Sequence, residues 1–183
     1  DEYKILKSGH NIAFDSGAFS LNFRKSGNGM PITRKGYEIY LIKGRPLAKG
    51  KVEIQLNFDS DFTAAGTAEN YNHLKNLEKA GLEITPAIHD YYGNEIKFYI
   101  DQGYEMIALG SIFDPVMKRQ IRTKKDIKYG IEEAIRLKPD IKIHVLASAS
   151  FDDPSRWPIY SSDAANWTHN VTYGYILWWN EDK

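Results

Sequence analysis

The sequence predicts an α/β protein with mainly parallel strands, and two observations carry that prediction. Short β-like runs recur along the chain, and several end on a polar residue just before a turn or helix signal. Amphipathic helical segments fill several of the gaps between these runs. With 183 residues, 42% of them hydrophobic, the chain fits one ordinary domain, so we expect a single α/β barrel domain over residues 1–183.

Six runs are predicted to be strands of this domain. They cover residues 11–14, 52–58, 84–88, 106–109, 141–146 and 159–162. A seventh run follows at 173–179, and residues 3–6 form a weaker eighth candidate. Strands of this length that alternate with helices are typical of a parallel sheet.

The first helix is expected to begin at a cap formed by Thr67. Its apolar side carries Tyr71, Leu74 and Leu77, and Gly81 suits the left-handed position that ends a helix.

Two further helices are predicted later in the chain. One runs through residues 96–100 before Gly103. The other opens at Thr123, places Ile127 and Ile131 on its apolar face and stops before Pro139.

The alternation of strands and helices fits either an open doubly wound sheet or a (β/α) barrel. No G-x-G-x-x-G turn is present, which counts against a dinucleotide-binding Rossmann domain. We favour a TIM-type barrel. Because such barrels take about 250 residues, or about 200 at the low end, this one is expected to be compact or incomplete.

Composition excludes several classes of function. The 24 basic and 24 acidic residues cancel, which argues against a wholly electrostatic nucleic-acid binder. The absence of cysteine excludes disulfides, a thiolate zinc site and a cysteine nucleophile. No apolar run approaches the roughly 20 residues that span a bilayer, and residues 1–4 show no signal-peptide pattern, so we expect a soluble, cytoplasmic protein.

A basic segment runs from residue 24 to residue 51. It carries eight lysines and arginines against Glu38 alone, with glycines between them, and we expect it to be mobile beside the first strand. A solvated loop and helix surface is the simpler interpretation, and contact with a phosphate backbone is the sharper one. The candidate nucleic-acid contacts are Arg24, Lys25, Arg34 and Lys35.

Residues at the carboxyl ends of the predicted strands are the candidates for a functional site. In parallel α/β architectures the ligand lies outside these ends. The six residues are Asp15, Asp59, His89, Gly110, His144 and Asp163. Three aspartates and two histidines favour a functional set, although aspartate is also a common cap and turn residue.

Asp15 follows the first confident strand and Asp163 follows the next-to-last one. In a closed barrel the first and last strands are neighbours, so these two carboxylates would face each other. Paired carboxylates can divide the work of nucleophile and proton carrier, which suits chemistry at a glycosidic or N-glycosidic bond.

The residues around these carboxylates resemble a known enzyme family. Residues 15–20 read D-S-G-A-F-S, which is similar to the D-S-G-G-F-Q motif of the queuine/archaeosine tRNA-guanine transglycosylases and closer to the form in their short phage and bacterial relatives. Further similar segments follow in order: 56–59 (L-N-F-D), 69–71 (E-N-Y), 86–89, 104–110, the strand around His144, and 160–167 (Y-S-S-D-A-A-N-W). The resemblance spans roughly residues 10–175.

The resemblance implies a TIM-barrel enzyme that exchanges a guanine in DNA or tRNA for a 7-deazaguanine base. Asp163 would be the nucleophile that forms a covalent sugar ester, and Asp15 the acid/base. Asp59 and the turn at 108–111 would read the edge of the base. The implied substrate-binding residues are Ser16, Gly17, Phe19, Asp59, His89, Gly110, Ser111, His144 and Tyr160, with Phe19 and Tyr160 available to stack on the base.

The sequence also departs from the family. Without cysteine it lacks the zinc subdomain of the full-length enzymes, and Asp163 is followed by A-A-N-W where the family has C-V-L-P-T-R. The glycine-rich base-binding loop is reduced to residues 109–111. We expect no cofactor, and a homodimer or a partner subunit stays open as the source of further polymer-binding surface.

Two other functions stay open. A metal-dependent, amidohydrolase-like hydrolase would use His89, His144 and Asp163 as ligands, although the first strand has no H-x-H pair. A non-enzymatic nucleic-acid- or carbohydrate-binding barrel would use the aromatic residues gathered after residue 156, which are more often packing residues.

Overall fold

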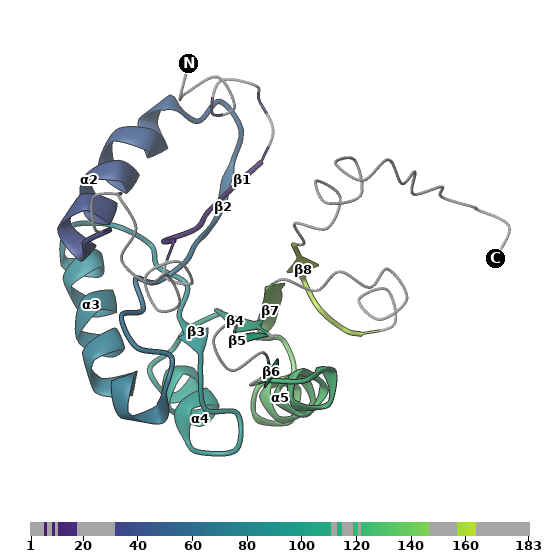
Figure 1. The fold of residues 1–183 in the computed structure, drawn as a ribbon. Coiled ribbons are helices and arrows are strands. Elements are labelled where there is room, and N and C mark those ends of the chain that lie inside the picture. Colours follow the sequence, from purple (N-terminus) through teal and green to yellow (C-terminus); the bar gives the residue numbers. More distant parts are fainter. Residues whose placement is uncertain are drawn as a thin grey trace, which may run out of the picture.

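The computed structural model describes residues 6, 9, 11–17, 32–110, 113–114, 119–120, 122–146 and 157–163. Over these residues the chain is a mixed α/β protein with parallel strands in small sheets and four α-helices (Figure 1). The strands are β1 (Ile12–Phe14), β2 (Val52–Gln55), β3 (Ala87–Ile88), β4 (Met106–Gly110), β5 (Phe113–Asp114), β6 (Arg119–Gln120), β7 (Lys142–Leu146) and β8 (Ser161–Ser162). The helices are α2 (Arg34–Gly44), α3 (Thr67–Lys79), α4 (Glu95–Asp101) and α5 (Lys124–Leu137), with short 3₁₀ turns η2 (Arg45–Leu47) and η3 (Ala64–Gly66).

The parallel strands lie side by side in the order in which they occur in the chain. β1 pairs with β2, and β3, β4, β7 and β8 form a four-stranded sheet in that order. A parallel bridge between Leu56 and Thr85 links the end of the β2 run to the residues before β3. Within the described residues no strand pairing joins β8 to β1.

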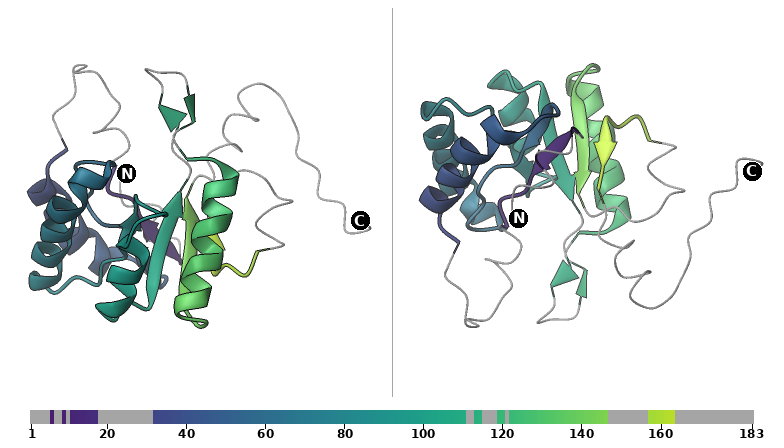
Figure 2. Two further views of the ribbon diagram at one scale, coloured as in Figure 1. Left: turned by 90° about the horizontal axis from the view of Figure 1, so that it is seen from below. Right: turned by 90° about the horizontal axis from the view of Figure 1, so that it is seen from above.

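The helices lie along the outer side of this row of strands (Figures 1 and 2). The core between the two layers forms because each strand alternates its side chains between two faces. Ile107 and Leu109 of β4 and Ile143 and Val145 of β7 are fully buried against the helices. The helices contribute Leu41, Leu74, Leu77, Ile96, Tyr99, Ile127, Ile131 and Ala134 to the same core.

The alternate residues of the strands point to the inner side of the row. Ile54, Leu56, Ala87 and Ala108 form a second, smaller buried cluster there. This inner side carries the site described below.

Most of the predicted elements are present with narrower bounds. The six strands predicted between residues 11 and 162 correspond to β1, β2, β3, β4, β7 and β8. The prediction that His144 ends its strand is wrong, because it is the central residue of β7. The run at 173–179 and most of 3–6 lie outside the described residues.

The predicted helix ends were partly right. Thr123 caps α5 through a reciprocal capping box with Asp126, and Gly81 adopts the left-handed conformation after α3, with φ of 79°. Thr67 is not a cap: Gly66 occupies that position, and Thr67 is the first residue of α3.

Part of the basic segment is helical, because residues 34–47 form α2 and η2, which agrees with the simpler interpretation of a solvated loop and helix surface. The Thr33 side chain caps α2 by accepting a hydrogen bond from the Gly36 N–H (3.0 Å). Tyr37 and Leu41, which lie one turn apart on the inner side of α2, are buried in the core. The sequence did not predict this helix because it contains two glycines, which disfavour helices, and many charged residues.

Two further features complete the fold. β5 and β6 form a small antiparallel hairpin that was not predicted, on the side to which the carboxyl ends of β4 and β7 point (Figure 2). Among the described helices, none combines the length and apolar character needed to cross a membrane.

Candidate functional site

A cavity of about 370 Å³ opens on the inner side of the strand row. Its walls come from the carboxyl ends of the parallel strands and the segments that follow them. The lining residues are Ala13, Phe14, Asp15, Ser16, Leu56, Asn57, Asp59, Phe62, Ala87, Ile88, His89, Gly110, Arg122, His144, Leu146 and Asp163. All six strand-end candidates from the sequence are therefore brought together in one cavity.

Strand register explains why the cavity has room. Ala87, Ala108, His144 and Ser161 are aligned across β3, β4, β7 and β8. The two alanines leave space on the inner face, and His144 projects into it from the middle of β7. Ser161, in the same row, lies 2.9 Å from His144 Nδ1 through its Oγ.

Gly110 and Leu146 are paired in register between β4 and β7, and both line the cavity. A Cβ atom on Gly110 would lie 2.9 Å from the Leu146 Cβ, closer than side chains pack. Glycine is required here because two neighbouring strands crowd the same side of the sheet.

His89 is fixed from several directions at one end of the cavity. Its Nε2 lies 3.0 Å from Asp59 Oδ2, and both side chains are almost fully buried. The Phe62 ring stacks on the imidazole at a centroid distance of 4.9 Å and an interplanar angle of 17°. The ring has little freedom to turn.

The backbone of His89 is held as firmly as its ring. Glu95 Oε2 accepts hydrogen bonds from the N–H groups of His89 and Asp90, both at 2.6 Å. Arg122 donates to the carbonyl of His89 and, at 3.0 Å, to the carbonyl of Phe62. The two chain segments that flank the cavity are thus joined by one guanidinium.

The pKa values of the two buried groups, Glu95 and Arg122, are shifted in opposite directions. Burial raises the pKa of Glu95, although the His89 charge and the two backbone N–H donors work against that effect. Burial also lowers the pKa of Arg122, which Tyr91 and Glu95 partly offset. Both groups are less stable in their charged forms than they would be in water.

Some polar atoms of the cavity wall are left without partners in the described part of the chain. They are Asn57 Oδ1 and His89 Nδ1. The Asn57 amide nitrogen is used, since it donates to Asp59 Oδ1 (2.6 Å) and to the Asn70 carbonyl (2.9 Å). Buried polar atoms are seldom left unpaired, so this wall is suited to hydrogen-bond a polar ligand.

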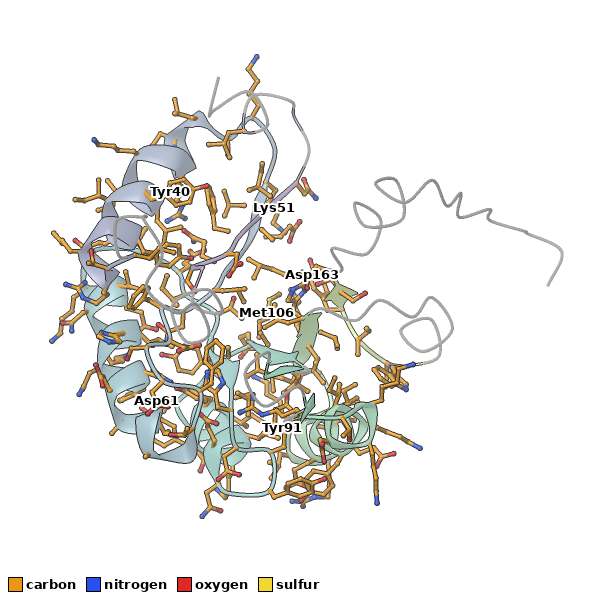
Figure 3. The ribbon with its side chains drawn as sticks, in the orientation of Figure 1. Tyr40, Lys51, Asp61, Tyr91, Met106 and Asp163 are labelled. Atoms are coloured by element: carbon orange, nitrogen blue, oxygen red, sulfur yellow. The ribbon has the colours of Figure 1, made fainter. Side chains whose placement is uncertain are left out.

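Asp15 and Asp163 line the cavity from β1 and β8. Asp163 Oδ1 lies 3.5 Å from His144 Nε2, and its side chain is 58% exposed. In Figure 3 Asp163 lies on the side of β8 that faces β1 and β2. Asp15 is also exposed, and its Oδ1 accepts a hydrogen bond from the Gly17 N–H (3.2 Å). A ligand in the cavity can therefore reach both carboxylates.

The remaining sequence candidates are distributed differently. Ser16 is buried and lines the cavity, whereas Gly17 does not, although it adopts a left-handed conformation with φ of 70° beside Asp15. Tyr160 lies outside this cavity: it lines a neighbouring one of about 330 Å³ and donates a hydrogen bond to Glu53 (2.9 Å). Phe19, Arg24, Lys25 and Ser111 lie outside the described residues.

Arg34 and Lys35 are described and do not approach the cavity. Both pair with the buried carboxylate of Glu38, at 2.6 Å for Arg34. These hydrogen bonds, that of Lys35 foremost, lower the pKa of Glu38. The two cations stabilise α2 through Glu38, so both already have an ion-pair partner and neither is an unpaired charge available to bind a phosphate.

The residues do not fit the metal-site alternative. No group of three or more histidine and acidic side chains is placed to hold a metal ion within the described residues. His89 faces Asp59, whereas His144 faces Asp163, so the three suggested ligands belong to separate pairs.

Four residues of this site were missed in the sequence: Asn57, Phe62, Glu95 and Arg122. Asn57 carried a signal, because it is a polar residue inside an apolar strand run. Glu95 resembles any acidic residue in the first turn of a helix, and Arg122 simply precedes a helix cap. Only the tertiary fold brings these last two to the backbone of His89.

Comparison with known proteins adds no assignment: no family model, curated protein or solved structure matches the chain. The geometry of the cavity is therefore the basis for a functional proposal.

Proposed function

We propose that the chain is a base-exchange transglycosylase, which replaces a guanine in DNA or tRNA with a 7-deazaguanine base through a covalent Asp163–sugar intermediate. One observation carries the proposal: both carboxylates that the family resemblance picks out, Asp15 and Asp163, line one cavity with five of its implied substrate-binding residues, which are Ser16, Asp59, His89, Gly110 and His144. That cavity combines two accessible carboxylates with a buried polar wall, as a reaction at an N-glycosidic bond requires.

We also propose that the strands close into a small TIM-type barrel. Support comes from the parallel strands in chain order, with helices on the outer side. Asp15 after β1 and Asp163 after β8 line the same cavity. The Tyr160 hydroxyl, just before β8, donates to Glu53 of β2, which links the last described strand to the first two.

The reaction needs only the two carboxylates. The Asp163 carboxylate attacks the anomeric carbon of the sugar, the C–N bond to guanine breaks, and the departing base takes a proton from Asp15. The ionised Asp15 then takes the ring N–H proton of the incoming base, whose nitrogen attacks the same carbon and releases Asp163. One proton enters and one leaves, so no oxidant, reductant or metal is consumed.

The neighbours of the carboxylates have separate parts in this scheme. His144, at 3.5 Å, orients Asp163 and is itself held by Ser161. Asp59, His89 and Asn57 would bind the edge of the base at the opposite wall, where Asn57 Oδ1 and His89 Nδ1 have no hydrogen-bond partner among the described residues. Gly110 keeps the floor of the cavity open for a flat ring.

The test is nucleoside mass spectrometry after incubation with duplex DNA or tRNA and a 7-deazaguanine base. We expect incorporation by the unaltered chain and a loss of at least about a thousandfold in Asp163→Ala, because the nucleophile is removed. His73→Ala is the matched control, since His73 lies on α3 away from the cavity. Incorporation by Asp163→Ala at the unaltered rate would refute the nucleophile assignment, and no incorporation into either polymer would refute the reaction.

A further inference from the structure

Two exposed tyrosines form a stacked pair that the proposed reaction does not use. The rings of Tyr92 and Tyr129 lie 4.5 Å apart between centroids, with their planes inclined by 24°. Tyr92 is 62% exposed, the largest value among the exposed large hydrophobic residues of the described chain, and Tyr129 is 38% exposed. Core packing does not explain a pair with this exposure.

The pair is held in place without being buried. The Tyr92 hydroxyl donates to Asp126 Oδ1 at 2.6 Å. The other oxygen of Asp126 accepts hydrogen bonds from the N–H and hydroxyl of Thr123, at 2.6 and 2.8 Å. Tyr92 is therefore tied to the capping box of α5. A ring fixed in this way loses little conformational freedom when a ligand stacks on it.

The pair lies near the cavity along two separate segments. Tyr92 belongs to the turn that follows His89, and the cap of α5 directly follows Arg122. Both His89 and Arg122 line the cavity, and Arg122 joins the two segments by its bond to the His89 carbonyl. The tyrosine pair is therefore connected to the cavity wall through the two segments that His89 and Arg122 join.

Three exposed lysines lie on the helix that carries Tyr129. Lys124, Lys125 and Lys128 are exposed on the first turns of α5, and all three precede Tyr129 in the sequence. The nearby carboxylates are partly used: Asp126 binds Tyr92, and Glu132 lies 3.7 Å from Lys128. Lysines beside exposed aromatic rings are the combination that binds single-stranded nucleic acid, with cations for phosphates and rings for bases.

We propose that Tyr92, Tyr129 and these lysines form a stacking platform for an unpaired nucleotide next to the reacting nucleotide of the polynucleotide. The proposal rests on the proposed function, since it takes a polynucleotide as the substrate. Bases in a duplex are already stacked on each other, so the platform favours single-stranded or locally opened DNA or RNA.

The test is fluorescence anisotropy with labelled single-stranded DNA, single-stranded RNA and duplex DNA of one sequence. Tyr92→Ala should weaken single-strand binding roughly tenfold, the scale of one lost base stack, and leave the weaker duplex binding unchanged. Tyr92→Phe keeps the ring and should retain most of the affinity. Tyr40→Ala, which removes a tyrosine 47% exposed on α2, is the matched control and should bind like the unaltered chain.

The lysines are tested by salt dependence. Lys125→Ala and Lys128→Ala should each lower the slope of log affinity against log salt by about one and weaken binding uniformly across sequences. The preferred single strand, DNA or RNA, identifies the polymer. Unchanged binding by Tyr92→Ala, or an equal loss in Tyr40→Ala, would overturn the platform.

The same proteins separate this inference from the proposed function. If Asp163→Ala abolishes incorporation while Tyr92→Ala binds single strands normally, the platform is wrong and the reaction stands. If single-strand binding depends on Tyr92 but no base is incorporated into any polymer, the platform stands and the reaction is wrong.

Discussion

The two sides of the cavity are built in contrasting ways. On one side the backbone of His89 is bound at its N–H by Glu95 and at its carbonyl by Arg122, all three being buried. On the other side Asp15 and Asp163 are exposed carboxylates that follow the short strands β1 and β8. One wall is fixed by buried polar contacts, whereas the carboxylates of the other wall are accessible to solvent and to a ligand.

In the proposed reaction, this difference would place the groups that stabilise the fold and the groups that react in different parts of one site. A wall that recognises a flat polar ligand needs donors and acceptors at fixed positions, which buried hydrogen bonds supply. A carboxylate that must attack a carbon atom needs access and a hydration shell that can be displaced. Substitutions on the two walls should therefore have separable effects on folding and on turnover.

The largest effect on stability is expected from Arg122→Met. The substitution leaves the carbonyls of His89 and Phe62 buried without their donor, so we expect a loss of about 2–4 kcal/mol in the free energy of unfolding. Urea unfolding followed by circular dichroism measures it. The control is Arg136→Met, which breaks an exposed pair with Glu133 and should leave the free energy of unfolding almost unchanged.

On the exposed wall, a substitution of Asp15 should have little effect on stability. Asp15→Asn should change the free energy of unfolding by less than about 0.5 kcal/mol, because the side chain is exposed and an amide can still accept from the Gly17 N–H. If Arg122→Met proved as harmless as Asp15→Asn, the buried wall would not be the stabilising one.

The sequence predicted the strands and their ends better than the connections between them. Asp15, Asp59, His89 and Gly110 could be found because a polar residue or glycine ending an apolar run is a local signal. Arg122 could not be found, since its contacts are to backbone atoms from distant segments. The helix after Thr33 was missed because capping and burial of one side, rather than local preference, form it.

A smaller loss is expected from Gly110→Ala, which tests how tightly the floor of the cavity is packed. The new methyl group would approach the Leu146 Cβ to 2.9 Å, and neither strand can move without disturbing the register of β4 and β7. We expect a destabilisation of about 1–3 kcal/mol by urea unfolding. An unchanged free energy of unfolding would mean that the two strands have room to separate.

The smallest effect is a change in pH dependence, through Glu95. Burial raises the pKa of Glu95, so the folded chain holds that proton more tightly than the unfolded chain does. Its contribution to stability is then complete below the unfolded-state pKa and is lost as the pH rises through the raised value. Glu95→Gln replaces the carboxyl with an uncharged amide and should remove this loss. Urea unfolding between roughly pH 4 and roughly pH 8 should show that the free energy of unfolding of the variant increases relative to that of the unaltered chain as the pH rises. The reverse trend would mean that His89 and Arg122 hold Glu95 in its ionised form, and that the fixed wall of the cavity carries charge.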